Sequence, residues 1–263
     1  MRTAGIDAAS SPGKTATCWV SWDGGTGFVE VNDLPEVSDE EVARCVAEAD
    51  WIGIDIPLGW PSAFVAAVAA HQARKPWGGA SMETLRLRET DRWVTTHARC
   101  PGNDVARCHP MSASTDRIGV PALRFARILG PIDRSGEAPT TADGSARVVE
   151  TYPAASLFVW GLPHRGYKGS TAAQSEARRQ LVARIREEVS LEADDATWER
   201  CTNSDHALDA LIASLTVRAK ALGLCHPVPR EHLAVARVEG WIALPLPGSL
   251  GRLRRDARRG TED

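Results

Sequence analysis

Three acidic side chains in this 263-residue chain each follow a short apolar run. Asp7 ends the run in AGIDAAS, Asp55 ends the run in IGIDIPLG, and Glu150 ends the run in ARVVETYP. A carboxylate at the end of a buried strand destabilises the fold, because burial penalises its charge, so its presence there suggests a functional role. Asp205 and Asp209 add two carboxylates four residues apart, and this spacing puts them on one face of a helix. The five acids could therefore form one cluster.

An acidic cluster of this kind predicts a site for a divalent cation. Carboxylates within about 4–6 Å of one another raise one another's pKa and destabilise the fold unless a counter-charge is present. Mg²⁺ supplies that charge, prefers oxygen ligands, and keeps part of its water shell for phosphate oxygens or a nucleophile. Two such ions about 4 Å apart suit the cleavage of a phosphodiester.

Each acid also has a simpler structural explanation. Asp7 and Asp55 could be turn residues that bond to their own backbone. Glu150 could pair with an arginine. Asp205 could favour the positive end of its helix, and Asp209 could form a surface ion pair. The position of three of the five acids at the ends of apolar runs is what favours a shared site.

The elements that must bring the acids together follow from the hydrophobic pattern. Alternating residues on both sides of Gly24 and Gly25 predict a hairpin. Ser38 caps a predicted helix over 38–50, and Asn203 or Ser204 caps another that Gly223 ends. An amphipathic helix is also predicted over 171–189. The predicted strands cover residues 3–8, 16–23, 26–33, 51–57 and 146–153, with 238–245 as a candidate last strand.

This order predicts an α/β fold with a mixed sheet. An antiparallel trio followed by alternating strands and helices requires helices packed on the faces of the sheet. Neighbouring strands of such a sheet bring their carboxyl ends to one edge, where sites form. Residues 59–144 are rich in Gly, Pro and Arg. This composition predicts an insertion that covers part of the main core and does not form a core of its own, within a single domain over 1–250. Residues 251–263 form a basic tail that we expect to be flexible.

Seven short motifs make the chain similar to a known family. They are GIDAA, IGIDIPLGWP, RETD, ETYPAAS, YKG, DHALDA and EGWIALP, and together they span nearly the whole chain. As a set they resemble the domain of unknown function 429 family, which is described as a group of predicted nucleases with a ribonuclease H fold. The segment HALDAL also resembles the H-x-x-D-A helix of bacterial Holliday-junction resolvases.

The resemblance implies a fold and a set of ligands. The fold would be a ribonuclease H-like mixed five-stranded sheet, three antiparallel strands and then parallel strands, with helices on both faces and a large insertion after the fourth strand. That insertion is longer than a minimal ribonuclease H core needs. It could narrow the cleft so that only short or small substrates enter. Matched by position, the expected metal ligands and catalytic residues are Asp7, Asp55, Glu150 and Asp209, with Asp205 or His206 as a supporting ligand or proton-transfer group.

Five further residues could bind substrate. Arg88 and Arg92 in the segment METLRLRETDRWV could bind phosphate, because the guanidinium fork matches phosphate oxygens. Lys168 in GYKG could contact a phosphate, and Tyr167 could stack on a base. Lys14 in SSPGKTA could help a loop to cradle a phosphate, although the spacing is not that of a P-loop. The alternatives are a solvated charged face for the arginines and a plain surface loop for GYKG.

The overall composition limits the partners. The net charge is -3, so no global basic field favours tight, nonspecific duplex binding. The six cysteines include no CxxC pair and no signal peptide is predicted, so we expect reduced thiols and a cytoplasmic location. Cys100, Cys108 and His109 are too few and too irregularly spaced to favour zinc. No apolar run approaches the ~20 residues that a membrane span needs.

These observations favour a nuclease or phosphodiesterase that depends on Mg²⁺ or Mn²⁺ and acts on a nucleic acid or a nucleotide. A second hypothesis is a phosphotransferase or ATPase of the sugar-kinase and actin-like superfamily, which shares the strand order. A third is a module that binds a metal or nucleotide without turnover. The oligomeric state does not follow from the sequence.

Overall fold

The computed structural model describes residues 1–33, 36–103, 105–114, 116–134, 141 and 143–254. Residues 255–263, most of the predicted basic tail, lie outside the described residues. The strands are β1 (Arg2–Asp7), β2 (Ala16–Asp23), β3 (Thr26–Asn32), β4 (Trp51–Ile54), β5 (Val148–Glu150) and β6 (Leu191–Glu192). The α-helices are α1 (Asp39–Glu48), α2 (Ser62–Gln72), α3 (Met82–Arg86), α4 (Glu89–His97), α5 (Asp116–Arg134), α6 (Pro153–Val159), α7 (Ala172–Glu188), α8 (Asp195–Asn203), α9 (Asp205–Ala221) and α10 (Leu233–Glu239). Short 3-10 helices are η1 (Pro12–Lys14), η2 (Arg230–His232) and η3 (Leu250–Arg254).

The strands form a mixed six-stranded sheet in the order β5-β4-β1-β2-β3-β6. β1, β2 and β3 are antiparallel neighbours, whereas β4 pairs with β1 and β5 pairs with β4 in parallel. This confirms the predicted α/β class and the mixed sheet. The predicted count of five strands is one short, because β6 pairs with β3 over only two residues and is too short to show an alternating pattern.

The predicted last strand over 238–245 is wrong. The helix α10 continues to Glu239, and Gly240 then turns the chain with a φ of 90°. Ile242 makes only a single parallel bridge to Glu150. The apolar residues around Ile242 are buried, so packing in a loop rather than sheet pairing explains their composition.

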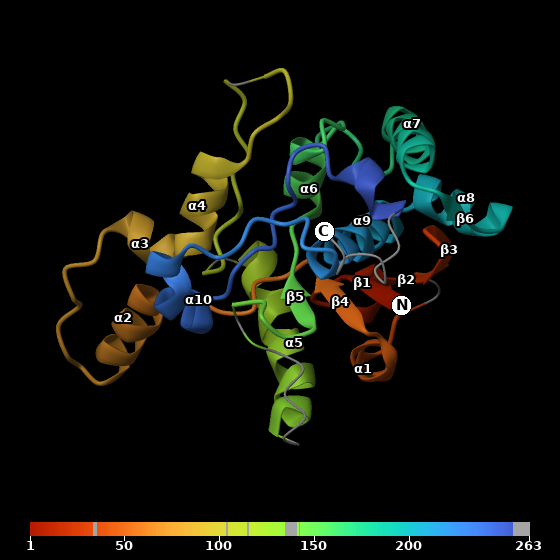
Figure 1. Ribbon diagram of the computed structural model, residues 1–263. Coiled ribbons are helices and arrows are strands. Elements are labelled where there is room, and N and C mark those ends of the chain that lie inside the picture. The colour runs from red at the N-terminus through yellow and green to blue at the C-terminus, as the bar shows by residue number, and fades with distance from the viewer. Residues whose placement is uncertain (34–35, 104, 115, 135–140, 142, 255–263) are drawn as a thin grey trace.

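Helices cover both faces of the sheet, with α1 and α5 on one side and α9 on the other (Figure 1). Side chains alternate between the faces along each strand. In β1, Ile6 packs in a buried cluster with Val42 of α1 and Phe125 of α5. Thr3 points to the opposite face, where its Oγ1 lies 2.8 Å from the Oγ of Ser214 in α9. The central strand is therefore buried on both faces.

The backbone of α9 lies almost in contact with the two central parallel strands. A Cβ at Gly5 of β1 would lie 1.9 Å from the carbonyl oxygen of Ala210, and a Cβ at Gly53 of β4 would lie 2.5 Å from that of Ala213. Side chains at these positions would hold the helix away from the sheet. The two glycines thus allow the first turns of α9 to approach the ends of β1 and β4.

Several predicted local features are confirmed. Gly24 and Gly25 have φ values of 52° and 92° in the hairpin turn between β2 and β3. The Ser38 side chain caps α1, and Ser204 caps α9 by accepting from the N–H of Ala207. These caps satisfy backbone donors that have no partner within the helix.

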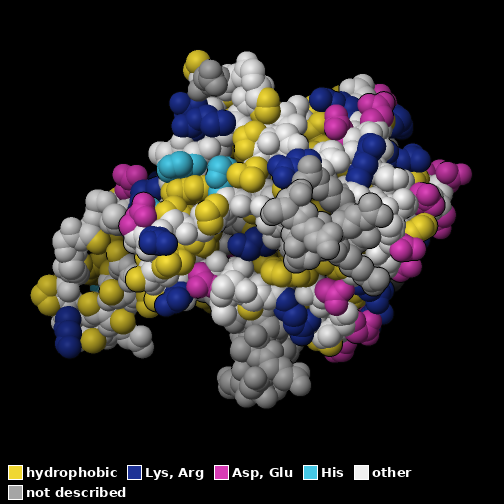
Figure 2. Space-filling model, in the orientation of Figure 1, with side chains coloured by type: hydrophobic (Ala, Val, Ile, Leu, Met, Phe, Trp, Pro, Cys, Tyr) yellow, Lys and Arg dark blue, Asp and Glu magenta, His cyan; other side chains and the backbone are white. Residues whose placement is uncertain are grey.

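The predicted insertion contains α2, α3, α4 and α5. In Figure 1, α2, α3 and α4 lie with α10 on one side of the molecule, away from α7 and α8. Hydrophobic side chains gather over α2, α3 and α10 in the space-filling view (Figure 2). The helix α5 is longer than the short pieces expected there, and its buried Phe125 and Leu129 make it part of the cover of the sheet. Although α2 is rich in Ala and Val, neither it nor any other helix in the described residues is long and apolar enough to cross a membrane.

Candidate metal centre

Asp7, Asp55 and Asp209 form a carboxylate triad where two strands meet a helix. β1 ends at Asp7, Asp55 directly follows β4, and Asp209 lies in the second turn of α9. Ile6 and Ile54 are register partners in the parallel pair, so the acids that follow them emerge side by side. One oxygen from each of the three carboxylates lies within 4.8 Å of the others. The structure therefore brings together three of the four expected metal ligands.

The triad carries more negative charge than its surroundings balance. Burial raises the pKa of Asp55 well above its ordinary range; the Lys168 ammonium offsets part of this, and Asp7 and Asp209 raise the pKa further. Burial also raises the pKa of Asp209 to about 6, although Lys168 acts in the opposite direction. Three carboxylate oxygens around one space are a donor set that suits a hard divalent cation. A cation there would allow all three acids to ionise.

His206, in the first turn of α9, adds a titratable group to the triad. Its Nδ1 lies 2.6 Å from Oδ2 of Asp7. The hydrogen bond to Asp7 raises the pKa of His206, against the lowering effect of burial. Asp205, the other residue expected to support the metal site, instead accepts a hydrogen bond of 2.9 Å from the backbone N–H of Gly169. It holds the neighbouring loop.

The carboxylate of Asp209 has a different partner on each oxygen. The Tyr167 hydroxyl donates to Oδ1 at 2.7 Å, and the Lys168 ammonium lies 2.6 Å from Oδ2. Tyr167 is only 1% exposed, so its ring packs in the core and is not available to stack on a base as expected. Burial and the adjacent Asp209 both raise the pKa of the Tyr167 hydroxyl, which therefore stays protonated and donates.

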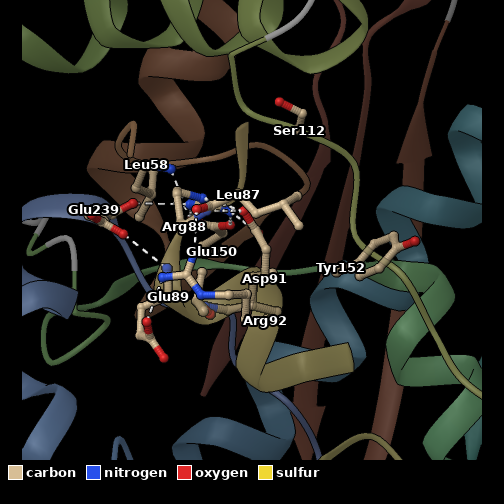
Figure 3. Close-up of polar contacts among 12 residues, drawn as sticks. Leu58, Leu87, Arg88, Glu89, Asp91, Arg92, Ser112, Glu150, Tyr152 and Glu239 are labelled. Atoms are coloured by element: carbon tan, nitrogen blue, oxygen red, sulfur yellow. Dashed lines mark hydrogen bonds and ion pairs between the residues drawn. The ribbon is translucent and has the colours of Figure 1, made fainter. Parts of the chain in front are cut away.

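Glu150 pairs with an arginine, which was the simpler explanation for this acid. Arg88 donates to both of its carboxylate oxygens, at 2.6 and 2.7 Å, and the N–H of Leu58 donates to Oε2 at 3.0 Å (Figure 3). The same guanidinium donates to both oxygens of Asp91. Arg88 is 1% exposed, so it is a buried bridge and not the phosphate-binding side chain that we expected. Glu150 also lines the cavity beside the triad, but it is not one of the three acids whose oxygens lie within 4.8 Å of one another.

Glu239 extends this buried network to two helix starts. Its Oε1 accepts from the N–H of Ser62 at 2.8 Å and its Oε2 accepts from the N–H of Glu89 at 2.9 Å, so one side chain joins the first turns of α2 and α4. Its backbone oxygen accepts from Arg88 at 3.1 Å. Arg92, predicted to bind phosphate, pairs with Glu89 at 2.6 Å. The RETD motif therefore fixes the insertion to the end of β5.

A cavity of about 310 Å³ lies at the triad, although Asp209 is not among its lining residues. Asp7 and Asp55 line it together with three side chains that could meet a phosphate: Lys14, Lys168 and His206. The predicted insertion contributes apolar side chains to the lining, Pro110, Met111, Ile118 and Pro121, besides the charged Arg88 and Asp91. Arg117 lines the cavity as well. The insertion thus encloses the acids in a space of small-molecule size.

A family model described as Protein of unknown function (DUF429) matches residues 5–233. The chain belongs to this family. The matched span of the DUF429 chain contains the triad, the Arg88–Glu150 pair and the GYKG loop. Neither the curated proteins nor the solved structures compared with the chain include a match.

Some residues that build this DUF429 site were missed from the sequence. Gly5 and Gly53 each stand two residues before a triad aspartate, and the repeated Gly-Ile-Asp could have predicted the close helix. Arg178, fully buried, precedes Leu181 and Val182 by three and four residues, which is the spacing of the buried face of α7. An arginine at such a position predicts a dedicated set of acceptors. Glu239 lies in the EGWIALP motif, which could place it near the acids, but no local pattern predicted its hydrogen bonds to two helix starts.

Proposed function

We propose that this DUF429 protein is a divalent-metal-dependent phosphodiesterase that hydrolyses a nucleic acid or a nucleotide. The observation that carries the proposal is the triad: oxygens of Asp7, Asp55 and Asp209 come within 4.8 Å of one another. They do so beside a cavity that two lysines line. Acidic oxygens next to cationic side chains are the arrangement that a metal-bound phosphate requires.

The topology supports the same proposal. An antiparallel β1-β2-β3 unit followed by parallel β4 and β5, with the order β5-β4-β1-β2-β3, is the arrangement expected of a ribonuclease H-like sheet. The acids lie on the first strand, after the fourth strand and on the helix that crosses the sheet. β6 adds only two residues at the far edge.

Asp7, Asp55 and Asp209 would hold Mg²⁺ or Mn²⁺. When bound, such an ion polarises a phosphoryl oxygen and lowers the pKa of water. In the hydrolysis, an oxygen–phosphorus bond forms from water, the ester bond breaks, and one proton passes from the water to the departing alkoxide. His206 is placed to carry that proton, because Asp7 holds one ring nitrogen and the side chain lines the cavity. Lys14 and Lys168 would hold the phosphate.

The cavity favours short substrates. The acids share the cavity with the apolar side chains of Pro110, Met111, Ile118 and Pro121, and a duplex is too wide to enter a space of about 310 Å³. A nucleotide or the end of a single strand can place one phosphodiester there, with its base against the apolar wall. We therefore expect small diesters and single strands to be cleaved faster than duplex.

The test is a hydrolysis assay with bis(p-nitrophenyl) phosphate, a dinucleotide, a labelled single strand and the matching duplex, with Mg²⁺, Mn²⁺ or EDTA. We expect metal-dependent cleavage that Asp55→Asn lowers at least about 100-fold. Asp23→Asn is the matched control, because Asp23 also ends a strand, β2, but is exposed and lies outside the cavity lining. Turnover of ATP without diester cleavage would favour a phosphotransferase, and a metal-induced rise in melting temperature without turnover would favour a binding module.

A further inference from the structure

Lys168 places a positive charge directly on the triad. Its ammonium nitrogen lies 2.6 Å from Oδ2 of Asp209, and the side chain lines the cavity beside Asp7 and Asp55. About half of the side chain, 53%, is exposed. A half-exposed lysine usually does not keep a fixed ion pair, because the pair costs side-chain entropy and the ammonium is well hydrated in water. The contacts of the neighbouring backbone decide whether Lys168 is held beside Asp209.

The backbone on both sides of Lys168 is fixed by buried groups. Arg178 donates to the carbonyl oxygens of Tyr167 at 2.6 Å and Gly169 at 2.8 Å, and Asp205 accepts from the N–H of Gly169. Tyr167 is itself anchored to Asp209 through its hydroxyl. Gly169 adopts a φ of 116°, which few other residues tolerate. These contacts therefore fix the backbone of the loop that carries Lys168.

Arg178 uses its guanidinium to hold this loop and the start of α9. It is 0% exposed, and all five of its N–H donors are used. Besides the loop, they bind the carbonyl oxygens of Thr202 and Asn203 and the hydroxyl of Ser175. The carbonyls of Thr202 and Asn203 lie just before α9, so Arg178 joins the lysine loop to the start of the helix that carries Asp209. The positions of Lys168 and Asp209 are thereby linked.

A charge count shows what the lysine does to the site. The three triad carboxylates carry three negative charges. Glu150, the fourth expected ligand, shares Arg88 with Asp91, so these three side chains together keep one net negative charge beside the triad. On the triad itself, with His206 neutral, one ammonium leaves two negative charges, which one divalent cation neutralises. Two divalent cations would leave an excess of positive charge beside a lysine.

We propose that the site binds a single divalent cation and that Lys168 supplies the second positive charge. Because Lys168 lines the cavity, its ammonium would contact a phosphate oxygen of a bound diester, while the triad would hold the cation. This inference rests on the proposed function. It differs from the two-ion arrangement expected from the sequence, and it makes Lys168 a catalytic residue that touches the substrate.

The test is the stoichiometry of Mn²⁺ binding, measured by calorimetry at pH 8 and checked by electron paramagnetic resonance for coupled ions. We expect one Mn²⁺ per chain in the wild type and none in Asp55→Asn. Lys168→Met removes the built-in charge, and we expect a second bound ion or an affinity at least about tenfold higher for the first. Lys168→Arg retains the charge and should keep one ion. Melting temperatures in EDTA check that each variant is folded.

The outcomes separate this inference from the proposed function. No specific Mn²⁺ in the wild type would overturn both. Two ions in the wild type, with coupled resonance, would overturn the role of Lys168 and leave a metal-dependent hydrolase in place. One ion in both the wild type and Lys168→Met, with equal affinity, would also overturn it, because the lysine would then contribute no charge that the cation feels.

Discussion

Gly5 of β1 lies opposite Gly53 of β4 in the parallel ladder, and α9 passes over both with its backbone in contact. Each glycine stands two residues before a triad aspartate, so the missing side chains and the acids share one face of the sheet. The same face that lets the helix approach therefore presents Asp7 and Asp55 to it. The helix α9 contributes Asp209, the third acid of the triad.

Gly5→Ala should disrupt both the fold and the site. A Cβ there would lie 1.9 Å from the Ala210 oxygen and 2.4 Å from the Ser214 nitrogen, and both are backbone atoms that cannot turn aside. We expect a loss of at least about 1–3 kcal/mol in the free energy of unfolding, with weaker Mn²⁺ binding. Urea denaturation and calorimetry measure the two effects. Gly130→Ala in α5 is the control, since a Cβ there meets no atom within 4 Å; equal stability losses in both variants would contradict the argument.

Asp55→Asn should stabilise the protein when no metal is present. The substitution removes a charge that burial and two neighbouring carboxylates oppose, while the side chain keeps its size. We expect the melting temperature in EDTA to rise by a few degrees, which corresponds to about 1–2 kcal/mol. Added Mn²⁺ should raise the melting temperature of the wild type and leave that of the variant unchanged. A lower melting temperature for the variant in EDTA would show that Asp55 has a structural partner instead.

Arg88→Met should be among the most destabilising single changes. It leaves the buried carboxylates of Glu150 and Asp91 without their shared partner. Breaking a buried ion pair from one side costs about 3–5 kcal/mol. Arg88→Lys should recover little, because an ammonium cannot make the forked contacts. In the control Arg92→Met, the lost pair with Glu89 is partly exposed, and we expect a change below about 1 kcal/mol. Denaturant unfolding gives both values, and similar losses at the two arginines would refute the bridge.

Asp209 should make the metal-free protein lose stability as the pH rises. Its pKa in the folded state is about 6, above the ordinary value of 3.8, so between these values the folded chain binds more protons than the unfolded chain. The stability that this difference provides is present at about pH 4 and is lost by about pH 7. The wild type in EDTA should therefore lose more stability than Asp209→Asn over that interval. Mn²⁺ affinity should rise over the same interval, because the cation competes with the proton. Parallel pH profiles of stability for the two proteins would count against this assignment.

Part of this site could be predicted from the sequence because the relevant information is local. Asp7 and Asp55 end short apolar strands, and the capped helix places Asp209 at a known turn. The Gly24–Gly25 hairpin fixes the direction of β2 and β3. These features depend on neighbours within a few residues, which a single sequence displays.

The rest depends on contacts between distant segments. Arg88 and Glu150 are 62 residues apart, and nothing near either one distinguishes a phosphate-binding arginine from a buried bridge. Tyr167 was expected on an exposed glycine loop, but its hydroxyl reaches Asp209 from 42 residues away. The two-residue β6 forms only because the rest of the sheet provides an edge for it. Burial of these polar groups decides their roles, and burial is set by the whole fold.

We propose that Asp7, Asp55 and Asp209 hold one divalent cation, and crystals soaked in Mn²⁺ and measured at the manganese absorption edge would show it. We expect a single anomalous peak within about 2.0–2.3 Å of one oxygen from each of the three carboxylates, and no such peak in Asp55→Asn. A peak that contacts only one of these acids, or manganese bound elsewhere with the triad empty, would contradict it.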